Sequence, residues 1–215
     1  MKDNKLAGGI YLVIDPSMEE GILFEKLEQV LQEGIAIVQL WDNWPQDIQK
    51  ETLINAICDL CHRYQVPVFI NNEWDLLNSL PLDGVHFDSI PADFDKIKQR
   101  LPKEVKIGLT CNNDLSAVKW AERNSVNYIS FCTIFPSATS NSCELVSFQT
   151  IEQARKITSM PIFLAGGIQL SNLPKLKGLD FDGVALVSGI MSSVSPAEAT
   201  KQYLALLPNK EIQKR

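Results

Sequence analysis

Short apolar runs alternate along this chain with longer stretches in which apolar residues recur every three or four positions. The short runs are rich in Val, Ile, Leu and Phe and have the length of buried strands, whereas the longer stretches have the period of amphipathic helices. This alternation is typical of parallel α/β architecture and predicts a single (β/α)8 TIM barrel. The predicted strands are Gly9–Ile14, Ile35–Leu40, Val68–Ile70, Gly84–Phe87, Lys106–Thr110, Tyr128–Cys132, Ile162–Ala165 and Gly183–Val187.

The longer stretches each carry one apolar stripe that would cover the outside of such a barrel. Residues 23–31 and 54–64 show the pattern most clearly, with apolar side chains at three- and four-residue spacing. Gly34, Gly84, Gly108 and Gly183 stand near the beginnings of predicted strands. We expect these glycines in the turns that join helices to strands.

The length and composition fit one globular domain. At 215 residues the chain has the size of a single barrel, so we expect one domain over residues 1–215, with residues 208–215 as a frayed tail. The net charge of -6 argues against a nucleic-acid partner, whose phosphates would call for a basic surface. No apolar run reaches the roughly 18 residues of a membrane span. We therefore expect a cytoplasmic protein with neither a nucleic-acid nor a membrane partner.

The cysteines favour a reducing compartment. Their number is five, which is odd, and most of them lie within apolar segments rather than in the framework of a small secreted domain. Cys58 and Cys61 have C-x-x-C spacing but lie in a predicted helix, without a second cysteine pair or paired histidines. Incidental helix cysteines are favoured over a metal or redox role.

Two segments near the C-terminus have the pattern of a phosphate site. Phe163-Leu-Ala-Gly-Gly-Ile168 and Asp182-Gly-Val-Ala-Leu-Val-Ser-Gly-Ile190 each begin as a short apolar strand and continue into small residues. Small residues leave backbone N–H groups accessible to a phosphate. In (β/α)8 barrels the loops after the last two strands build such a site.

Polar residues follow most of the predicted strands, at the end of the barrel where such folds carry their chemistry. This ring offers amides, hydroxyls and carboxylates but no lysine or arginine, so a diphosphate ligand would call for a divalent metal. Asp42, Glu73 and Asp88 offer oxygens suited to Mg²⁺, although a role as helix N-caps or first-turn carboxylates is favoured for them. The ring comprises Asp15, Gln39, Trp41, Asp42, Asn43, Asn71, Asn72, Glu73, Asp88, Ser89, Thr110, Asn112, Thr133, residues 136–140, Gly166, Gly167, Val187 and Ser188.

The histidines and tryptophans leave alternatives open. A solvated position is favoured for His62, which lies on a predicted helix. For His86, inside the fourth predicted strand, a structural hydrogen bond is favoured over catalysis. Trp41, Trp44 and Trp74 form either an aromatic wall for a flat ring or packing beneath the loops.

Taken together, these motifs resemble the thiamine phosphate synthase and thiazole tautomerase family over nearly the whole chain. Any one of the motifs would be weak, but their order and spacing agree with the family. They are Tyr11-Leu-Val-Ile-Asp15, Gly34-Ile-Ala-Ile-Val-Gln-Leu40, Pro67-Val-Phe-Ile-Asn71, Asp83-Gly-Val-His86, Tyr128-Ile-Ser-Phe-Cys-Thr-Ile-Phe-Pro136, Ala165-Gly-Gly-Ile168 and Asp182-Gly-Val-Ala-Leu-Val-Ser188.

The resemblance implies an enzyme that couples a hydroxymethylpyrimidine diphosphate to a thiazole phosphate with Mg²⁺, the diphosphate leaving before the thiazole nitrogen captures the cation. A phosphorylated heterocycle is thus the implied partner, and a homodimer is a further expectation. The implied catalytic residues are Thr110 and Asn71, and the implied metal positions are Asn72, Glu73 and Asp88. The implied substrate-binding residues are Gln39, Trp41, Asn43, Ser137, Thr139, Ser140, Gly166, Gly167, Val187 and Ser188.

The chain departs from the family on the diphosphate half of the site. Residues 41–43 read Trp-Asp-Asn where the family has an Arg-acid-Lys triplet, and Ser140 replaces a lysine. Asn72 stands in place of a metal-binding aspartate, and Asn112 replaces the histidine of the tautomerase branch. Two hypotheses therefore stay open, a synthase with a rebuilt metal site and a non-catalytic barrel that binds a phosphorylated ligand. A different phosphosugar isomerase barrel is less favoured, because no paired acid and base stand out.

Overall fold

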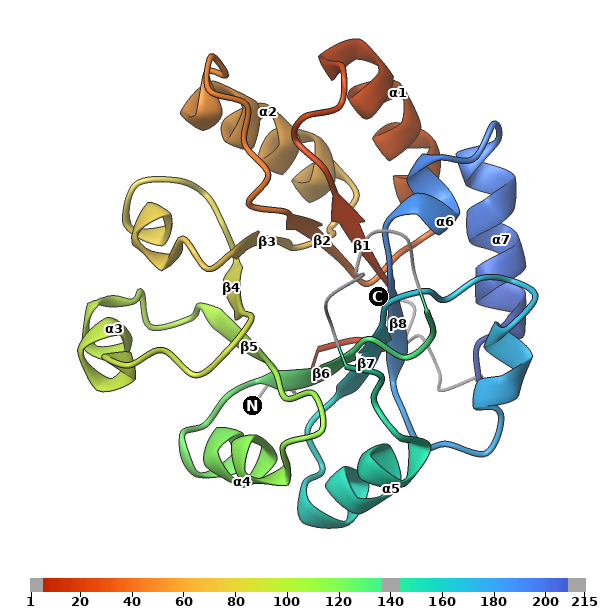
Figure 1. The fold of residues 1–215 in the computed structure, drawn as a ribbon. Helices are drawn as coiled ribbons and strands as arrows, with labels where there is room; N and C mark the ends of the chain where they lie inside the picture. Colours follow the sequence, from red (N-terminus) through yellow and green to blue (C-terminus); the bar gives the residue numbers. More distant parts are fainter. Residues whose placement is uncertain (1–5, 137–143, 209–215) are drawn as a thin grey trace.

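The strands form one closed, all-parallel barrel in a computed structural model that describes residues 6–136 and 144–208. Each strand pairs with its neighbour in sequence, and β8 closes the ring on β1. Figure 1 looks along the barrel and shows the helices as an outer ring. The predicted (β/α)8 fold is confirmed. The strands are β1 Gly9–Ile14, β2 Ile37–Leu40, β3 Val68–Asn71, β4 Gly84–Phe87, β5 Lys106–Thr110, β6 Tyr128–Cys132, β7 Ile162–Ala165 and β8 Gly183–Leu186.

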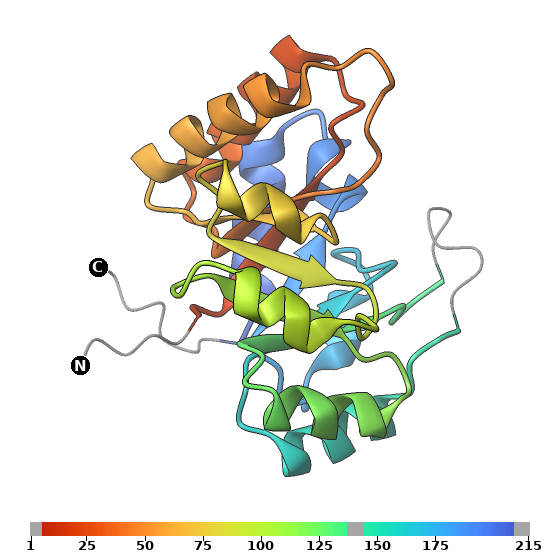
Figure 2. The ribbon, with the colours of Figure 1, turned by 90° about the vertical axis from the view of Figure 1, so that its left-hand side faces the viewer.

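The helices between the strands differ in length, and two connections hold only a short 3-10 helix. Figure 2 shows the barrel from the side, with α2, η1, α3 and α4 on its outer surface. A short α6 follows β8 directly, before α7 packs beside α1. The helices are α1 Glu20–Leu31, α2 Lys50–Arg63, η1 Trp74–Asn78, α3 Phe94–Arg100, α4 Leu115–Arg123, α5 Phe148–Ile157, η2 Leu173–Leu176, α6 Ser188–Met191 and α7 Pro196–Leu206.

Three predicted strand boundaries need correction. β2 begins at Ile37 rather than Ile35, because the chain leaves α1 through the Gly34 turn, with φ of 80°, and joins the ladder only where Ile37 aligns with Tyr11. β3 continues to Asn71, which pairs with β4. β8 ends one residue early, because Val187 is already the N-cap of α6.

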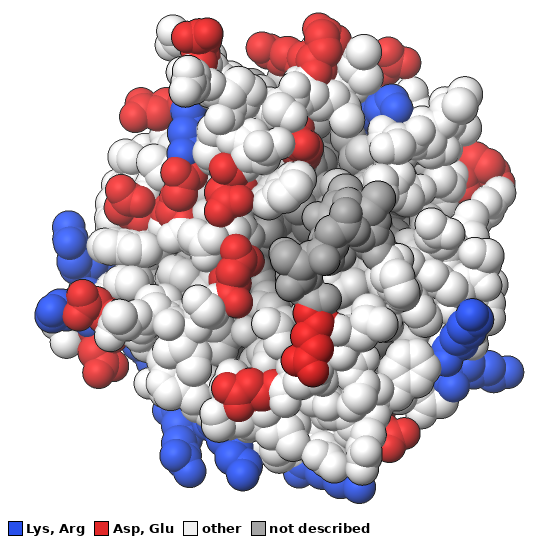
Figure 3. All heavy atoms as spheres, in the orientation of Figure 1, with Lys and Arg blue, Asp and Glu red and all other residues white. Residues whose placement is uncertain are grey.

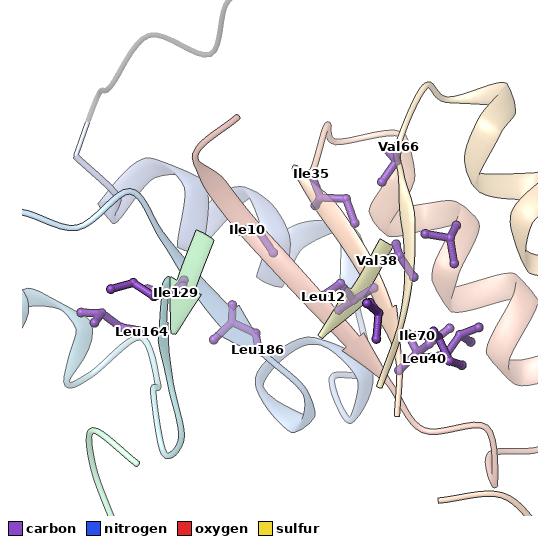
Figure 4. Packing of buried hydrophobic residues seen from close by; sticks show 14 of the residues in the cluster. Ile10, Leu12, Ile35, Val38, Leu40, Val66, Ile70, Ile129, Leu164 and Leu186 are labelled. Atoms are coloured by element: carbon purple, nitrogen blue, oxygen red, sulfur yellow. The ribbon is translucent and has the colours of Figure 1, made fainter. Parts of the chain in front are cut away.

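The larger core lies between the strands and the helices. Successive strand residues point to opposite faces, so the residues of β1 and β2 that face outward pack against α1, α2 and α7. Figure 4 shows several of these side chains, including Ile10, Leu12, Val38 and Leu40, which are fully buried. The helical stripe predicted over residues 23–31 faces this layer, with Leu23 and Leu27 fully buried.

A second core fills the barrel itself with aromatic rings. Its members are Tyr11, Ile37, Phe69, Tyr128 and Phe163.

Gly84, Gly108 and Gly183 lie within strands rather than in turns and make room for these rings, whereas Gly34 lies in the turn before β2, as expected. A Cβ at Gly108 would stand 2.0 Å from Cζ of Tyr128, and one at Gly183 would stand 2.6 Å from the ring of Phe163. Gly84 likewise faces the ring of Phe69, at 2.7 Å. The barrel thus packs large rings opposite residues that have no side chain.

Candidate active site

A layer of polar side chains lies directly above the aromatic core, at the ends of the strands. Strand alternation places Gln39, Asn71, His86, Thr110 and Ser130 on the inner face, one step beyond the rings. Four of them are buried, and Thr110 is partly accessible. Each finds hydrogen-bond partners, as buried polar groups require. The barrel mouth therefore presents a polar floor.

His86 links two sides of this floor. Its Nδ1 lies 2.9 Å from the hydroxyl of Tyr128, and its Nε2 lies 2.8 Å from Oγ1 of Thr110. Burial lowers the pKa of His86 to about 4, against a smaller opposing effect of Asp88. The ring is therefore neutral near pH 7, and the preference for a structural hydrogen bond over catalysis agrees with this geometry.

Two phenols continue the network below the floor. The hydroxyls of Tyr11 and Tyr128 lie 2.7 Å apart, and Tyr11 also donates to Oε1 of Gln39. Burial raises the pKa of both phenols, so they stay protonated. Our reading of the sequence missed Tyr11, Tyr128 and Ser130. The alternation of β1 and β6, which turns these side chains inward, is the signal that could have found them.

Two carboxylates converge above the amides. Gln39 donates from Nε2 to Oδ1 of Asn71 at 2.6 Å. The Nδ2 of Asn71 reaches Oδ2 of Asp42 at 3.3 Å and Oδ2 of Asp88 at 3.0 Å, and the Nδ2 of Asn72 reaches the same two oxygens at 3.1 and 2.8 Å. Asn72 is further fixed because its Oδ1 accepts from the backbone N–H of Asp88. Amide donors thus hold two exposed carboxylates side by side.

Glu73, a residue that we expected to bind metal, is engaged elsewhere. One carboxylate oxygen pairs with Nζ of Lys50, and the other accepts from Nε1 of Trp44 at 2.9 Å. Lys50 also lies 4.5 Å from the centre of the Trp44 ring, a cation–π contact. This cluster joins the start of α2 to the loop after β3. Of the three carboxylates suited to a metal, Asp42 and Asp88 thus lie together and Glu73 does not join them.

The loop after β2 turns Asn43 toward the end of β1. Its amide donates to both carboxylate oxygens of Asp15, each at 3.1 Å, and so ties this loop to the end of β1. Trp41 is partly exposed at the beginning of the same loop. Trp44 and Trp74 pack against the outer core, and Trp74 lies beneath Arg100 at 5.1 Å. Of the two roles left open for the tryptophans, packing beneath loops describes Trp44 and Trp74.

The opposite side of the mouth has the expected small-residue cup. Gly166 and Gly167 have φ of 86° and 64°, and a Cβ at Gly167 would stand 2.2 Å from the carbonyl oxygen of Phe135. Within residues 6–136 and 144–208, the backbone N–H groups of Gly167 and Ser188 donate no hydrogen bond. Val187 caps α6 beside them. Ser137, Thr139 and Ser140, which we also expected here, lie outside the described residues.

Charged side chains are unevenly distributed around the barrel mouth. Figure 3 shows acidic side chains on this face, mainly on the side of β2 to β4, and lysines and arginines mainly at its periphery. The acidic side chains of the mouth include Asp15, Asp42 and Asp88, whereas Lys50, at the start of α2, is paired with Glu73. A diphosphate would therefore meet carboxylates rather than cationic side chains.

The carboxylate pair fits a magnesium ion that arrives with a phosphorylated substrate. Mg²⁺ in such sites takes one or two carboxylates and completes its shell with phosphate oxygens and water. Asp42 and Asp88 supply two converging, exposed oxygens, and the described part of the chain holds no group of three His, Cys, Asp or Glu residues able to bind a metal. The donor set suits a substrate-borne Mg²⁺ better than a resident one.

The remaining candidates have structural roles. Cys58 and Cys61 are buried, and burial raises the pKa of the Cys58 thiol to about 12, which leaves it unreactive. His62 is exposed on the surface of α2, as expected, and its Nε2 lies 2.8 Å from Oδ2 of Asp83. The same carboxylate oxygen accepts from the backbone N–H of Val68.

Across the described ranges, each helix is too short or too polar to cross a bilayer.

Known proteins resemble this chain over nearly its full length. A family model described as thiamine monophosphate synthase matches residues 10–190. A thiamine-phosphate synthase of Picrophilus torridus is 30% identical over 200 residues, covering 93% of this chain and 96% of the relative. That of Halorhodospira halophila is 27% identical, covering 92% and 93%. Among solved structures, a thiamine phosphate pyrophosphorylase from Pyrococcus furiosus superposes with a TM-score of 0.79 at 18% identity, covering 94% of this chain and 96% of the other.

Proposed function

Because the chain belongs to the thiamine monophosphate synthase family, we propose that it is a thiamine-phosphate synthase of thiamine biosynthesis. It would join a hydroxymethylpyrimidine diphosphate to a thiazole phosphate and release diphosphate. The observation that carries this assignment beyond family membership is the mouth itself. The Gln39–Asn71 amide pair lies beside the converging carboxylates of Asp42 and Asp88, and the small-residue cup of Gly166 and Gly167 lies on the other side.

The two halves of the mouth suit the two substrates. Among the described residues, the backbone N–H groups of Gly167 and Ser188 have no hydrogen-bond acceptor, so they are positioned to bind the thiazole phosphate. Gln39 and Asn71 border the space for the pyrimidine. Trp41 begins the loop above them and is accessible to a ring placed on the floor.

The transfer breaks the bond between the pyrimidine methylene carbon and a diphosphate oxygen, and the electron pair leaves with the diphosphate. The lone pair of the thiazole nitrogen then forms the new carbon–nitrogen bond. Neutral His86 and the hydroxyl of Thr110 add no positive charge beneath the cationic pyrimidine, so the floor does not oppose its formation. Asp42 and Asp88 would hold Mg²⁺, which neutralises part of the charge on the leaving diphosphate.

A non-catalytic barrel that binds a phosphorylated ligand is the second candidate. The amide nitrogens of Asn71 and Asn72 already satisfy the two carboxylates, and Asn43 is held by Asp15 rather than aimed at a substrate. These contacts favour a mouth that keeps the phosphate cup without diphosphate chemistry. A cytoplasmic location and a homodimer stay predictions.

Diphosphate release from the two substrates, measured over a range of Mg²⁺ concentrations, separates the candidates. A synthase releases diphosphate only with Mg²⁺, and Asp88→Asn raises the Mg²⁺ concentration for half-maximal rate at least about tenfold, equivalent to about 1.4 kcal/mol. Asp75→Asn is the matched control, because Asp75 is an exposed carboxylate on η1. No release at any Mg²⁺ concentration, with calorimetry still detecting thiazole phosphate binding, would establish the non-catalytic barrel instead.

A further inference from the structure

An unbroken series of hydrogen bonds crosses the barrel mouth from the carboxylates of Asp42 and Asp88 to Thr110. The direction of each bond, meaning which side chain supplies the proton, follows from the chemistry of its partners. A carboxylate only accepts, an amide has one accepting and one donating end, and a hydroxyl has a single proton. These three facts fix the whole series from one end.

The amides come first. Because Oδ2 of Asp42 and Oδ2 of Asp88 only accept, the end of the Asn71 amide that faces them is its NH2 group, at 3.3 and 3.0 Å. The oxygen of Asn71 therefore faces Gln39, which must turn its own NH2 group toward it at 2.6 Å. The reversed amides would place two oxygens against carboxylates and lose both bonds. Gln39 is left with its oxygen toward Tyr11.

The phenols follow. An amide oxygen only accepts, so Tyr11 donates its single proton to Gln39. The contact of 2.7 Å between the two phenols must then be donated by Tyr128. Tyr128 in turn has no proton left for His86. The bond of 2.9 Å to Nδ1 must be donated by the histidine ring.

The protonated nitrogen of His86 fixes which side chains donate on the far side of the mouth. A neutral ring has one N–H, and with Nδ1 as the donor its Nε2 is a bare acceptor. Both Thr110 Oγ1, at 2.8 Å, and Ser130 Oγ, at 3.5 Å, lie within reach of this nitrogen. The shorter contact assigns Thr110 as its donor, which leaves Ser130 to donate to Thr110 at 3.0 Å. The neutral state fits the surroundings of the ring, which is buried and whose hydrogen-bond partners are the hydroxyls of Tyr128, Thr110 and Ser130 rather than carboxylates.

We propose that the carboxylates of Asp42 and Asp88 set the direction of this series, and thereby hold His86 as the Nδ1–H tautomer and Thr110 as an acceptor toward any ligand. His86 is on this view a positioning residue, which connects the two sides of the mouth without touching a substrate. The series passes through the aromatic core at Tyr11 and Tyr128, where side chains have no room to take up another arrangement.

The consequence for recognition rests on the proposed function. The hydroxyl of Thr110 donates its single proton to Nε2 of His86 and accepts one hydrogen bond from Ser130. One lone pair on its oxygen therefore remains for a ligand. A substituent placed against Thr110 must donate a hydrogen bond. An amino group on a heterocycle meets this requirement, and a carbonyl group does not.

Nitrogen NMR of the histidine rings tests the proposal directly, because the chain contains only His62 and His86. In the His62→Gln background, the ligand-free protein at neutral pH should show one neutral imidazole with Nδ1 protonated and Nε2 bare. In Asp42→Asn/Asp88→Asn the outer partners can both donate and accept. The Nε2–H tautomer should then rise from below about 10% to about one half of the population, because neither direction is enforced.

Asp15→Asn is the matched control, since Asp15 is an acidic residue of the same mouth that bonds Asn43 rather than Asn71. It should leave the tautomer as in the parent protein. A parent protein with Nε2–H or a doubly protonated ring would overturn the proposal, as would a double variant indistinguishable from Asp15→Asn. The measurement needs no substrate, so an inactive protein would refute the proposed synthase activity and leave this inference standing.

Discussion

Lowering the pH from 8 to 5 should destabilise this protein by about 2 kcal/mol through His86 alone. His86 is only 6% exposed, and its burial lowers the pKa from 6.5 to about 4 in the folded protein. In the unfolded chain the ring regains the ordinary value. Between these two values the unfolded state binds a proton that the folded state does not.

The sign and size follow from this difference. Because the folded pKa of this base is depressed, its contribution to stability is fully present above the unfolded value and is lost as the pH falls below about 6.5. Each pH unit below that value costs about 1.4 kcal/mol. At pH 5 the loss is about 2 kcal/mol, and it levels off near 3 kcal/mol below the folded pKa of about 4.

Urea unfolding at pH 8 and pH 5 measures the effect, with the His62→Gln background removing the other histidine. Other groups also titrate in this range, so the informative quantity is the difference between the parent and a variant that carries His86→Gln as well. The variant lacks the ionisable ring and should lose about 2 kcal/mol less stability on acidification. Equal losses in the two proteins would show that His86 does not titrate as a buried neutral ring.

Three further outcomes are expected. Gly108→Ala should destabilise the fold by about 3 kcal/mol or more, because the added carbon meets the ring of Tyr128 at 2.0 Å. Gly21→Ala, in the exposed first turn of α1, should change stability by less than about 1 kcal/mol. Thermal unfolding of both variants measures the difference, and similar destabilisation in the two would contradict the packing argument. Ser188→Asp should abolish binding of thiazole phosphate in calorimetry, because a carboxylate beside the cup repels the phosphate, and unchanged affinity would place the phosphate elsewhere. The Cys58 thiol, with its pKa raised to about 12 by burial, should react with a thiol reagent far more slowly in the native than in the unfolded protein at pH 8, and equal rates would show that the helix opens readily.

The fold could be predicted from the sequence because the patterns that indicate it extend over only a few residues. The alternation of strand-length apolar runs with helical stripes, such as the one at residues 23–31, needs no knowledge of distant contacts. The small residues after β7 and β8 also predicted a phosphate cup in local terms, and Gly166 and Gly167 have the backbone conformation that favours glycine. Strand ends were less certain, because the place where a ladder stops depends on the neighbouring strand.

The hydrogen-bond and ion-pair partners of the polar side chains could not be predicted from the sequence. Asp42 and Glu73 were equal candidates for a metal in the sequence, yet Glu73 turns to Lys50 and Asp42 turns to Asn71. The same applies to Asn43, whose amide is captured by Asp15 across two loops. Each choice is a competition among several donors and acceptors at short range, and only the relative placement of the loops decides it.

The sequence by itself determined the barrel, its eight strands and the small-residue cup, because hydrophobic period and glycine conformation act over a few residues. The tertiary structure alone decided the direction of the hydrogen bonds across the mouth. Tyr11 and Tyr128 are 117 positions apart in the chain and come within 2.7 Å only because the barrel closes. Closure brings the ends of all strands into one ring, so the chemistry of the mouth belongs to the ring rather than to any single segment.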